Sequence, residues 1–344
     1  MSFGKKPRIC AIGMLMPTYE IQLISLMKVF QEHGIESIKI TQFQNKILKF
    51  LDILFFLPLN RKKYDVIHIQ AHSRFNIISV MIALFWSKIL RKKIVMMYYG
   101  GAAKEFFSIS PIFFKTLFNQ IDQIVVAGRY IQSVFDDLGM QTKIIPHILD
   151  IEKWPFRQRE SSKFRLVWVR HLWKEYNPIM LLQVFQILKA RYPKLELKII
   201  GGGYLKDDMM NYISKNSLES VELMGRVSDA TLKSTLDWAD VFLNTTNVDN
   251  QPVSVLEAMT CGCPIVSTNP GGIPDIITHR DNGLLSDPND VDAMVKNIEL
   301  LFEDRQIYSF LSERGREYVV NKFGKQKIFE QWVEIYAALG YKLN

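Results

Sequence analysis

Cysteines and long apolar runs are scarce in this chain. Only three cysteines, Cys10, Cys261 and Cys263, occur among 344 residues, which excludes a disulfide scaffold and favours a reducing compartment. The first residues lack the apolar stretch and cleavage site of a secretory signal peptide. The uncharged run over 75–87 holds 13 residues, too few to span a bilayer. We therefore expect a cytoplasmic protein.

Metal-binding and dinucleotide-binding patterns are also absent. Cys261 and Cys263 lie two positions apart with no further cysteine and no histidine cluster beside them, so a zinc site is not expected. Asp290 and Asp292 are expected to cap a helix. The glycine run 201–203 is followed by Lys206 where the dinucleotide pattern requires glycine. A dehydrogenase is therefore not expected.

The positive charge is confined to the first part of the chain. Residues 1–158 hold 21 basic and 11 acidic residues, a net charge of +10, whereas residues 159–344 hold 22 and 24, a net charge of −2. Basic clusters at 5–8, 61–63 and 88–93 adjoin strongly apolar segments. This combination predicts peripheral binding to an anionic membrane such as the inner face of the plasma membrane. Ordinary core helices with solvated lysine ends are the alternative. No nucleic-acid motif accompanies the charge, so no nucleic-acid partner is expected.

Strand and helix patterns alternate along the chain. At 344 residues the length suggests two domains, and the alternation predicts two Rossmann-like, doubly wound α/β domains with parallel sheets. We expect the first over 1–158 and the second over 159–324. A final helix lies within 325–344, and the sequence leaves its packing on the first domain open. Ligands are expected beyond the carboxyl ends of the strands, in a cleft between the domains.

Two carboxylates, Asp249 and Glu257, flank a predicted helix start. Pro252 suits the beginning of this helix. The first N–H groups, those of Val253 and Ser254, would have no partner within the helix and form an anion site suited to a diphosphate. Carboxylates on either side suit a molecule with hydroxyls at both ends, which is the form of a nucleotide sugar. An ordinary helix cap with a solvated glutamate is the alternative.

The same stretch resembles a known donor-binding signature. Asp249, Glu257-Ala258-Met259, Gly262-Cys263-Pro264 and Gly271-Gly272 resemble the pattern of retaining glycosyltransferases of family 4, the glycosyl transferases group 1. Arg170, IIGGGYLKDD and VELMGRVSDATL match further family features in order. The resemblance covers the second domain well and the first only in outline. It implies the two-domain GT-B fold.

The resemblance implies a transfer of sugar from a nucleotide-sugar donor with retention of configuration and without a metal or other cofactor. Glu257 would bind the ribose, Asp249 the donor sugar, and Arg170 the leaving diphosphate. The first domain would hold a glycan or lipid-linked acceptor, as in bacterial envelope polysaccharide or lipopolysaccharide assembly. Further donor-site residues implied are Lys174, Gly202, Arg226, Val227, Val253 and Ser254.

Departures from the family pattern keep a second hypothesis open. The first carboxylate is Asp249 rather than glutamate, and Glu175 stands where a lysine is usual, with Lys174 beside it. Tyr99 replaces a histidine that often precedes the Gly100-Gly101 pair, and the loop after the first strand has only one glycine, Gly13. His72 or His68 could orient the acceptor or act as base, although a packed histidine is equally expected at either position. Tyr99 and His72 are therefore candidate catalytic residues, and a degenerate binding or scaffold protein is the alternative function.

Overall fold

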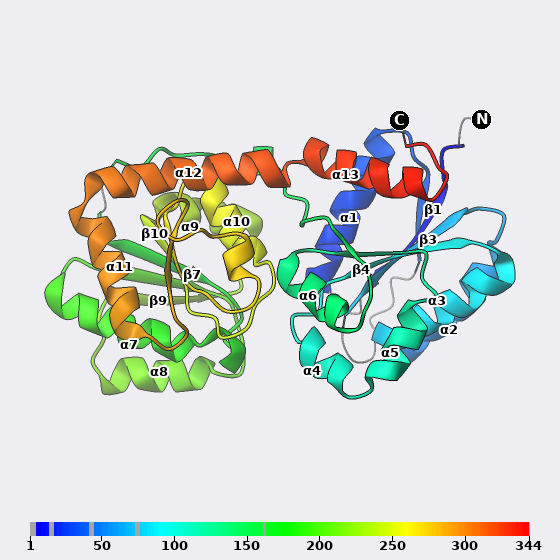
Figure 1. Cartoon of the computed structure of the whole chain (residues 1–344). Coiled ribbons are helices and arrows are strands. Elements are labelled where there is room, and N and C mark those ends of the chain that lie inside the picture. Colours follow the sequence, from blue (N-terminus) through cyan, green and yellow to red (C-terminus); the bar gives the residue numbers. More distant parts are fainter. Residues whose placement is uncertain (1–4, 14–16, 41–44, 73–75, 161–162, 344) are drawn as a thin grey trace. The chain divides into compact units, whose positions relative to one another are not determined.

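The computed structural model describes residues 5–13, 17–40, 45–72, 76–160 and 163–343 of the chain. It divides into two compact units (Figure 1), of which the first holds residues 1–148 with 325–344 and the second residues 149–324. In the loop after the first strand, Gly13 is described and buried, whereas residues 14–16 lie outside the described residues.

The first unit contains a six-stranded sheet in which every described pairing is parallel, in the order β2-β1-β3-β4-β5-β6. All six residues of β3 are buried, as expected for a strand with helices on both faces. The strands are β1 (Ile9–Ile12), β2 (Ser37–Ile40), β3 (Val66–Ala71), β4 (Lys93–Tyr98), β5 (Gln123–Val126) and β6 (Lys143–Ile144).

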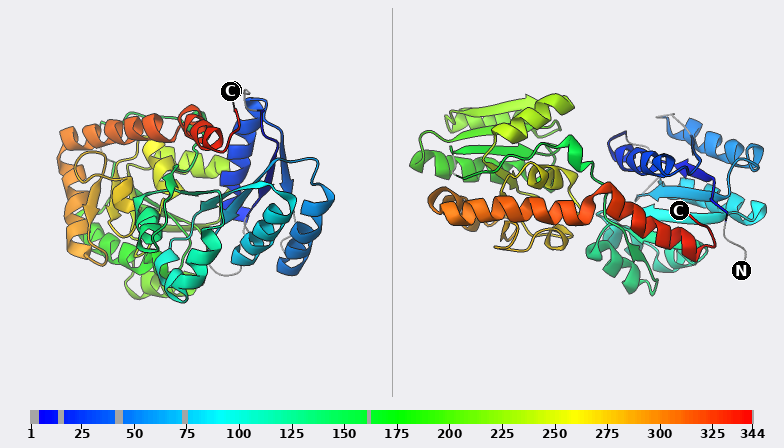
Figure 2. Two further views of the ribbon diagram at one scale, coloured as in Figure 1. Left: turned by 45° about the vertical axis from the view of Figure 1, so that its right-hand side comes forward. Right: turned by 90° about the horizontal axis from the view of Figure 1, so that it is seen from above.

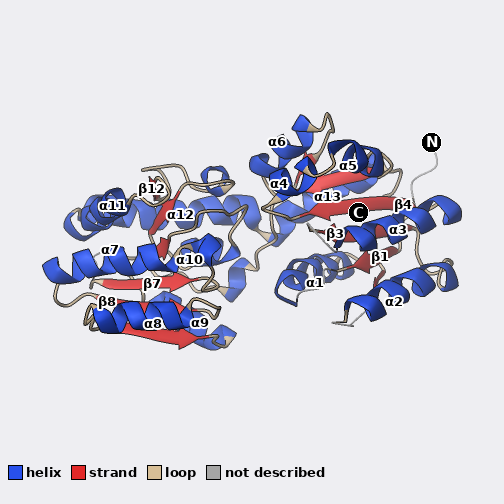
Figure 3. Cartoon of the chain, turned by 90° about the horizontal axis from the view of Figure 1, so that it is seen from below, coloured by secondary structure: helices blue, strands red, loops and turns tan. Residues whose placement is uncertain are grey.

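Helices cover both faces of this sheet. Figures 1 and 2 show α1 and α13 on one face, where Phe30, Val66 and Trp332 share a core. Figure 3 shows α2 and α3 on the opposite face, where Ile53, Ile67 and Val80 share a second core. The helices are α1 (Pro17–Glu32), α2 (Lys46–Leu59), α3 (Asn76–Leu90), α4 (Ala103–Ser108), α5 (Pro111–Phe118), α6 (Arg129–Asp137) and α13 (Lys325–Ala338).

The last helix, α13, is an integral part of the first unit although 176 residues of the second unit precede it. Trp332 and Tyr336 are buried, with ring centroids 6.2 and 5.7 Å from that of Phe30 on α1. The packing that the sequence left open is thus on the first sheet, because the apolar stripe of α13 covers a sheet face that α1 leaves partly open.

The second unit repeats the architecture, with a parallel sheet in the order β12-β11-β10-β7-β8-β9. Its strands are β7 (Arg165–Val169), β8 (Glu196–Ile200), β9 (Val221–Gly225), β10 (Val241–Asn244), β11 (Ile265–Thr268) and β12 (Leu284–Ser286). Its helices are α7 (Pro178–Arg191), α8 (Lys206–Lys215), α9 (Asp229–Trp238), α10 (Val253–Thr260), α11 (Val291–Glu303) and α12 (Arg305–Phe323).

The boundary between the units falls after residue 148, earlier than the expected boundary after 158. Leu149 N–H donates to Phe323 O at 2.9 Å, and Trp154 is buried in a core of the second unit. Arg159 is fully buried and donates to the carbonyls of Leu236, at 2.7 Å, and Cys261. Its guanidinium thus satisfies carbonyls at the ends of α9 and α10 that lack helical partners, which fixes this polar stretch to the second unit.

Several helices had no distinct sequence pattern. α2 is apolar around most of its circumference, so a helical period does not stand out. α3 instead matches the helix that the sequence predicts over 75–90. α4 is only six residues long. By contrast, the expected helix over 290–303 is present as α11, and the Asp290 side chain caps it by accepting from Ala293 N–H at 2.9 Å.

Candidate functional site

The carboxyl ends of the second sheet gather polar side chains from distant parts of the sequence. Arg170 follows β7, Asn244 ends β10, and Asp249 lies in the loop between β10 and α10. Because β7 and β10 are neighbours in the sheet, their ends bring these side chains together. This edge is where ligands bind in open α/β sheets.

Arg170 and Asp249 form an ion pair. Arg170 Nη2 donates to Asp249 Oδ2 at 2.5 Å, and Arg170 Nε donates to Asn244 Oδ1 at 3.3 Å. The guanidinium carbon lies 5.2 Å from the centroid of the Tyr176 ring, a cation–π contact. The side chains of Arg170 and Asp249 are 12% and 13% exposed. The cation is therefore held in place from three sides while part of it stays accessible.

Burial affects the pKa of both carboxyls. Burial raises the pKa of Asp249, and the Arg170 guanidinium and the Asn250 N–H oppose this shift. Burial raises the pKa of Glu257 on α10 to about 8, with Lys153 and Arg170 acting in the opposite direction. Strongly perturbed carboxyls close to one cation are typical of functional sites.

The start of α10 adds polar groups without partners. The helix begins at Val253 after Pro252 at the N-cap, so the N–H groups of Val253 and Ser254 have no helical acceptor. The buried Ser254 Oγ and Asn250 Oδ1 also lack hydrogen-bond partners among the described residues. Buried polar atoms without partners are costly, so a polar ligand or water is expected to fill this place.

The glycine pair of the sequence motif supports the Asp249 loop from behind. Gly271 has φ +58°, and a Cβ there would lie 2.2 Å from Asp249 O. A Cβ on Gly272 would lie 2.1 Å from Asn250 O, and Gly272 N–H donates to Asp249 O at 3.0 Å. Only glycine permits this approach, so the motif glycines position a carboxylate.

Glycines after β8 likewise allow the backbone to pass close behind the segment that carries Arg170. A Cβ on Gly201, whose φ is +138°, would lie 1.8 Å from Arg170 O. Gly202 lies beside the exposed Arg226, whose Nε is 3.7 Å from an ideal Cβ on Gly202. Val227, which follows Arg226, is partly exposed. The residues expected near the nucleotide base thus adjoin the loop that carries Arg170.

Lys174 is exposed at the start of a short 3-10 turn, Lys174–Tyr176. Its backbone N–H donates to Tyr204 Oη at 2.9 Å. The following residue, Glu175, is also exposed, and its carbonyl accepts from Asn247 N–H at 2.7 Å. The turn is thereby tied to the loop before Asp249.

The candidate residues of the first unit lie at the corresponding edge of the first sheet. His72 follows β3 and Tyr99 follows β4, and Tyr99 N–H donates to Ala71 O at 3.0 Å. The Tyr99 hydroxyl accepts from Gln70 Nε2 at 3.3 Å, and its ring stacks on His147 with centroids 4.9 Å apart. Burial raises the pKa of Tyr99, so this residue supplies a hydroxyl and an aromatic face, not a base.

His68 is a packed core residue. Its Nδ1 lies 3.2 Å from the Tyr336 hydroxyl, and its ring centroid is 4.9 Å from that of Trp332. Burial lowers its pKa to about 4. Of the two histidines considered from the sequence, only His72 lies outside a strand.

Three residues of the second-unit site had escaped the sequence reasoning. Tyr176 lies under the Arg170 guanidinium, Asn250 presents a buried amide oxygen, and Lys153 acts on Glu257 from the connecting segment. Asn250 directly follows Asp249 in sequence, a signal that could have found it. Nothing local marks Lys153, which pairs with Asp229 at 2.5 Å.

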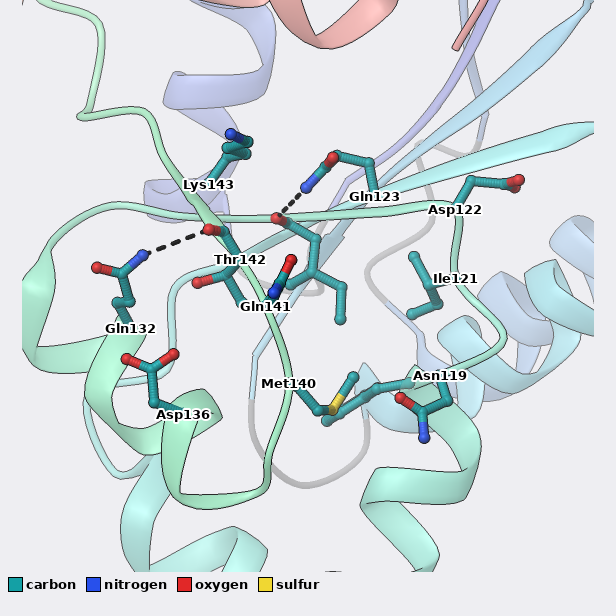
Figure 4. A pocket seen from close by; sticks show the side chains of 12 residues that line it. Asn119, Ile121, Asp122, Gln123, Gln132, Asp136, Met140, Gln141, Thr142 and Lys143 are labelled. Carbon is teal, nitrogen blue, oxygen red and sulfur yellow. Dashed lines mark hydrogen bonds between the residues drawn. The ribbon is translucent and has the colours of Figure 1, made fainter. Parts of the chain in front are cut away.

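A cavity of about 530 Å³ lies elsewhere in the first unit (Figure 4). It is lined near the start of β5 and β6 by polar residues such as Asp122, Gln132 and Thr142, by apolar ones such as Ile121 and Met140, and by none of the predicted site residues. Within the described residues there is no group of three or more histidines, cysteines or carboxylates placed to hold a metal ion. No helix in the same part of the chain combines the length and apolar character needed to cross a membrane.

The two Rossmann-like units and the second-unit site are similar to those of glycosyltransferases with the GT-B fold. Residues 150–318 match the family model of the glycosyl transferases group 1. This match covers about half of the chain and lies within the second unit, which therefore corresponds to the group 1 domain, as the sequence resemblance predicted.

Individual relatives agree with this assignment. An uncharacterised glycosyltransferase of Haemophilus influenzae is 30% identical over 166 residues, 48% of this chain and 46% of that protein. An Escherichia coli protein named UDP-Gal:alpha-D-GlcNAc-diphosphoundecaprenol alpha-1,3-galactosyltransferase is 23% identical over 235 residues, 64% of this chain and 58% of that protein. The chain thus spans about half the length of these relatives. The structure of HepE from Anabaena in complex with UDP has a TM-score of 0.78 at 18% identity, covering 96% of this chain and all of that one, a likeness of fold.

Proposed function

We propose that this chain is a retaining glycosyltransferase of family 4. It transfers a sugar from a nucleotide-sugar donor to a glycan or lipid-linked acceptor in the assembly of a bacterial envelope polysaccharide or lipopolysaccharide. The observation that carries the proposal is the Arg170–Asp249 pair in front of α10, inside the group 1 domain. The relative named for a diphosphoundecaprenol acceptor supports a lipid-linked acceptor.

In this proposal the donor diphosphate lies at the start of α10. The N–H groups of Val253 and Ser254 and the Ser254 hydroxyl donate to phosphate oxygens. Arg170 releases part of its contact with Asp249 and binds the diphosphate, and Lys174 adds a second cation. Positive charge at this place stabilises the negative charge that grows on the leaving group.

The carboxyls recognise the two ends of the donor. Glu257 binds the ribose hydroxyls, and Asp249 binds hydroxyls of the sugar. With its pKa raised to about 8, Glu257 can donate as well as accept at neutral pH. The base lies near Gly202, Arg226 and Val227. His72 and Tyr99 orient the acceptor in the first unit, and the reaction needs no metal or other cofactor.

A thermal-shift panel tests the donor site. UDP, GDP, ADP and CDP and their common sugar conjugates are added to the full chain. A ligand at about 100 times its Kd stabilises by about 2.7 kcal/mol, so one nucleotide series should raise Tm. The shift should vanish in Glu257→Ala and persist in Glu334→Ala, which removes an exposed carboxylate of α13. No shift with any nucleotide would favour a degenerate binding or scaffold protein.

The stereochemistry needs a separate measurement. Once a donor is identified, NMR of the product should show the anomeric configuration that the donor sugar had. Turnover in the presence of excess EDTA should be unchanged. An inverted product, or activity abolished by the chelator, would contradict the corresponding part of the proposal.

A further inference from the structure

The outward faces of α2 and α3 in the first unit are apolar. On α2, apolar side chains are exposed at every fourth position: Ile47, Leu51, Phe55 and Leu59. On α3, a second stripe is exposed: Ile78, Met81, Phe85 and Ile89. Leu59 is 81% exposed, Phe55 59% and Phe85 55%. The two helices therefore carry apolar residues on their outer as well as their inner sides.

These two stripes form one patch, which we call the α2–α3 face. The helices contact one another and cover the same face of the first sheet (Figure 3). Single exposed apolar residues are ordinary, but a contiguous patch marks an interaction surface. Among the described side chains of the two helices, only two charged ones are accessible, those of Asp52 and Lys88.

Unpaired basic residues border this face. Helices in a parallel α/β sheet run antiparallel to the strands, so α2 and α3 both end at the amino edge of the sheet. Five exposed cations lie there, none with an ion-pair partner in the described chain: Arg61, Lys62, Lys63, Lys88 and Arg91. Lys92 Nζ donates to Tyr64 O at 2.6 Å, which ties the two basic turns together.

We propose that the α2–α3 face docks on an anionic phospholipid bilayer. The apolar stripes would enter the boundary between headgroups and acyl chains, and the basic turns would contact phosphate groups. Charge decides between a lipid and a second copy of the chain. Two copies meeting through this face would bring together ten of these cations and only two carboxylates, one Asp52 from each copy.

This inference deepens the proposed function. It rests on that function in one respect, because a lipid-linked acceptor gives the enzyme a reason to bind a membrane. The docking face belongs to the first unit and the proposed donor site to the second. Vesicle binding can therefore be measured with neither donor nor acceptor present. Failure to bind vesicles would overturn the docking surface alone, and failure to bind any nucleotide would overturn the donor site alone.

The test is co-sedimentation of the full chain with vesicles of phosphatidylcholine, or of phosphatidylcholine with about one third phosphatidylglycerol, at low and raised salt. We expect binding to the anionic vesicles at low salt and a fall at raised salt. Phe55→Glu/Phe85→Glu and Lys62→Glu/Lys63→Glu should each lower the partition coefficient at least tenfold, with Tm retained. If Phe55→Glu/Phe85→Glu unfolds the chain, Phe55→Ser/Phe85→Ser is measured in its place.

Matched controls make the same changes on the second unit. Phe310→Glu alters an α12 residue that is 46% exposed, and Lys194→Glu/Lys296→Glu reverses two exposed cations. Both should bind as the parent chain does. The proposal is overturned by absence of binding, by equal losses in the controls, or by binding that ignores lipid charge. A dimer that Phe55→Glu/Phe85→Glu converts to monomer, without vesicle binding, would reassign the face to self-association.

Discussion

The two units share an architecture but differ in what their helices present outward. In the first unit, α2 and α3 expose apolar stripes beside unpaired cations. In the second unit, α11 and α12 expose mainly charged residues, among them Asp292, Lys296, Glu313 and Glu317. A parallel sheet constrains only the inner side of each helix. The outer sides are free to differ, and here they separate a surface suited to lipid from one suited to water.

The carboxyl edges of the two sheets differ in the same way. The second has an arginine and two carboxyls with perturbed pKa values. The first has His72 and a Tyr99 that is stacked on His147. The strongest electrostatics thus lie where the donor is proposed to bind, and four predictions probe this contrast.

Removal of the Arg170 guanidinium is expected to have the largest effect. Arg170→Ala should lower kcat/KM by about 10²- to 10³-fold, because charge on the leaving group loses its clamp. It should also lower Tm, since Asp249 keeps a buried carboxylate without a cation. Arg191→Ala breaks an exposed pair with Glu299 at 2.7 Å and should change neither. Unchanged turnover in Arg170→Ala would remove Arg170 from the mechanism.

Trp332→Ala should destabilise the first unit by about 3–5 kcal/mol, because it empties a fully packed site. Hydrogen exchange should then show lost protection in α1, β1 and β3, with β7, β10 and β11 unaffected. Lys327→Ala on the exposed side of α13 serves as the control. Equal loss of protection in both units would show that they unfold together and would break the contrast.

Gly271→Ala and Gly340→Ala separate close contact from backbone strain. Both residues have positive φ, +58° and +89°. A Cβ on Gly271 would lie 2.2 Å from Asp249 O, whereas a Cβ on Gly340 would meet no atom within 4 Å. Gly340→Ala should cost about 1 kcal/mol. Gly271→Ala should lower Tm further and weaken nucleotide binding, as measured by thermal shift. Equal effects of the two changes on Tm and on nucleotide binding would mean that the Asp249 loop shifts to make room for the Cβ without cost.

A pH dependence of stability is expected from Glu257. The pKa of Glu257 is about 8 in the folded chain against an ordinary 4.5. Between these two pH values the folded state therefore holds a proton that the unfolded state has lost. Stability from this group is complete below pH 4.5 and is lost as pH rises through about 8. The difference in Tm between Glu257→Gln and the parent chain should therefore shift in favour of the variant as pH rises across this range. The Tm of the control Glu313→Gln should change with pH as that of the parent chain does. A constant gap would mean an ordinary pKa.

Much of the fold could be predicted because its signals are local. Buried strands such as β3 and β7 are short apolar runs between polar loops, and α11 begins with its own cap at Asp290. α2 was harder to delimit because an apolar outer face removes its helical period. The apolar outer side of α2, together with that of α3, carries the proposed docking surface.

The sequence by itself determined the two α/β units and the spacing of Asp249, Glu257 and the Gly271-Gly272 pair, because strand periods, caps and motif spacings depend on neighbouring residues. Only the tertiary structure decided that Arg170 binds Asp249, 79 residues away, that Gly271 supports this loop, and that α13 completes the first core. The reason is topological: a parallel sheet places the ends of non-consecutive strands side by side, and the order of strands is written in no local segment.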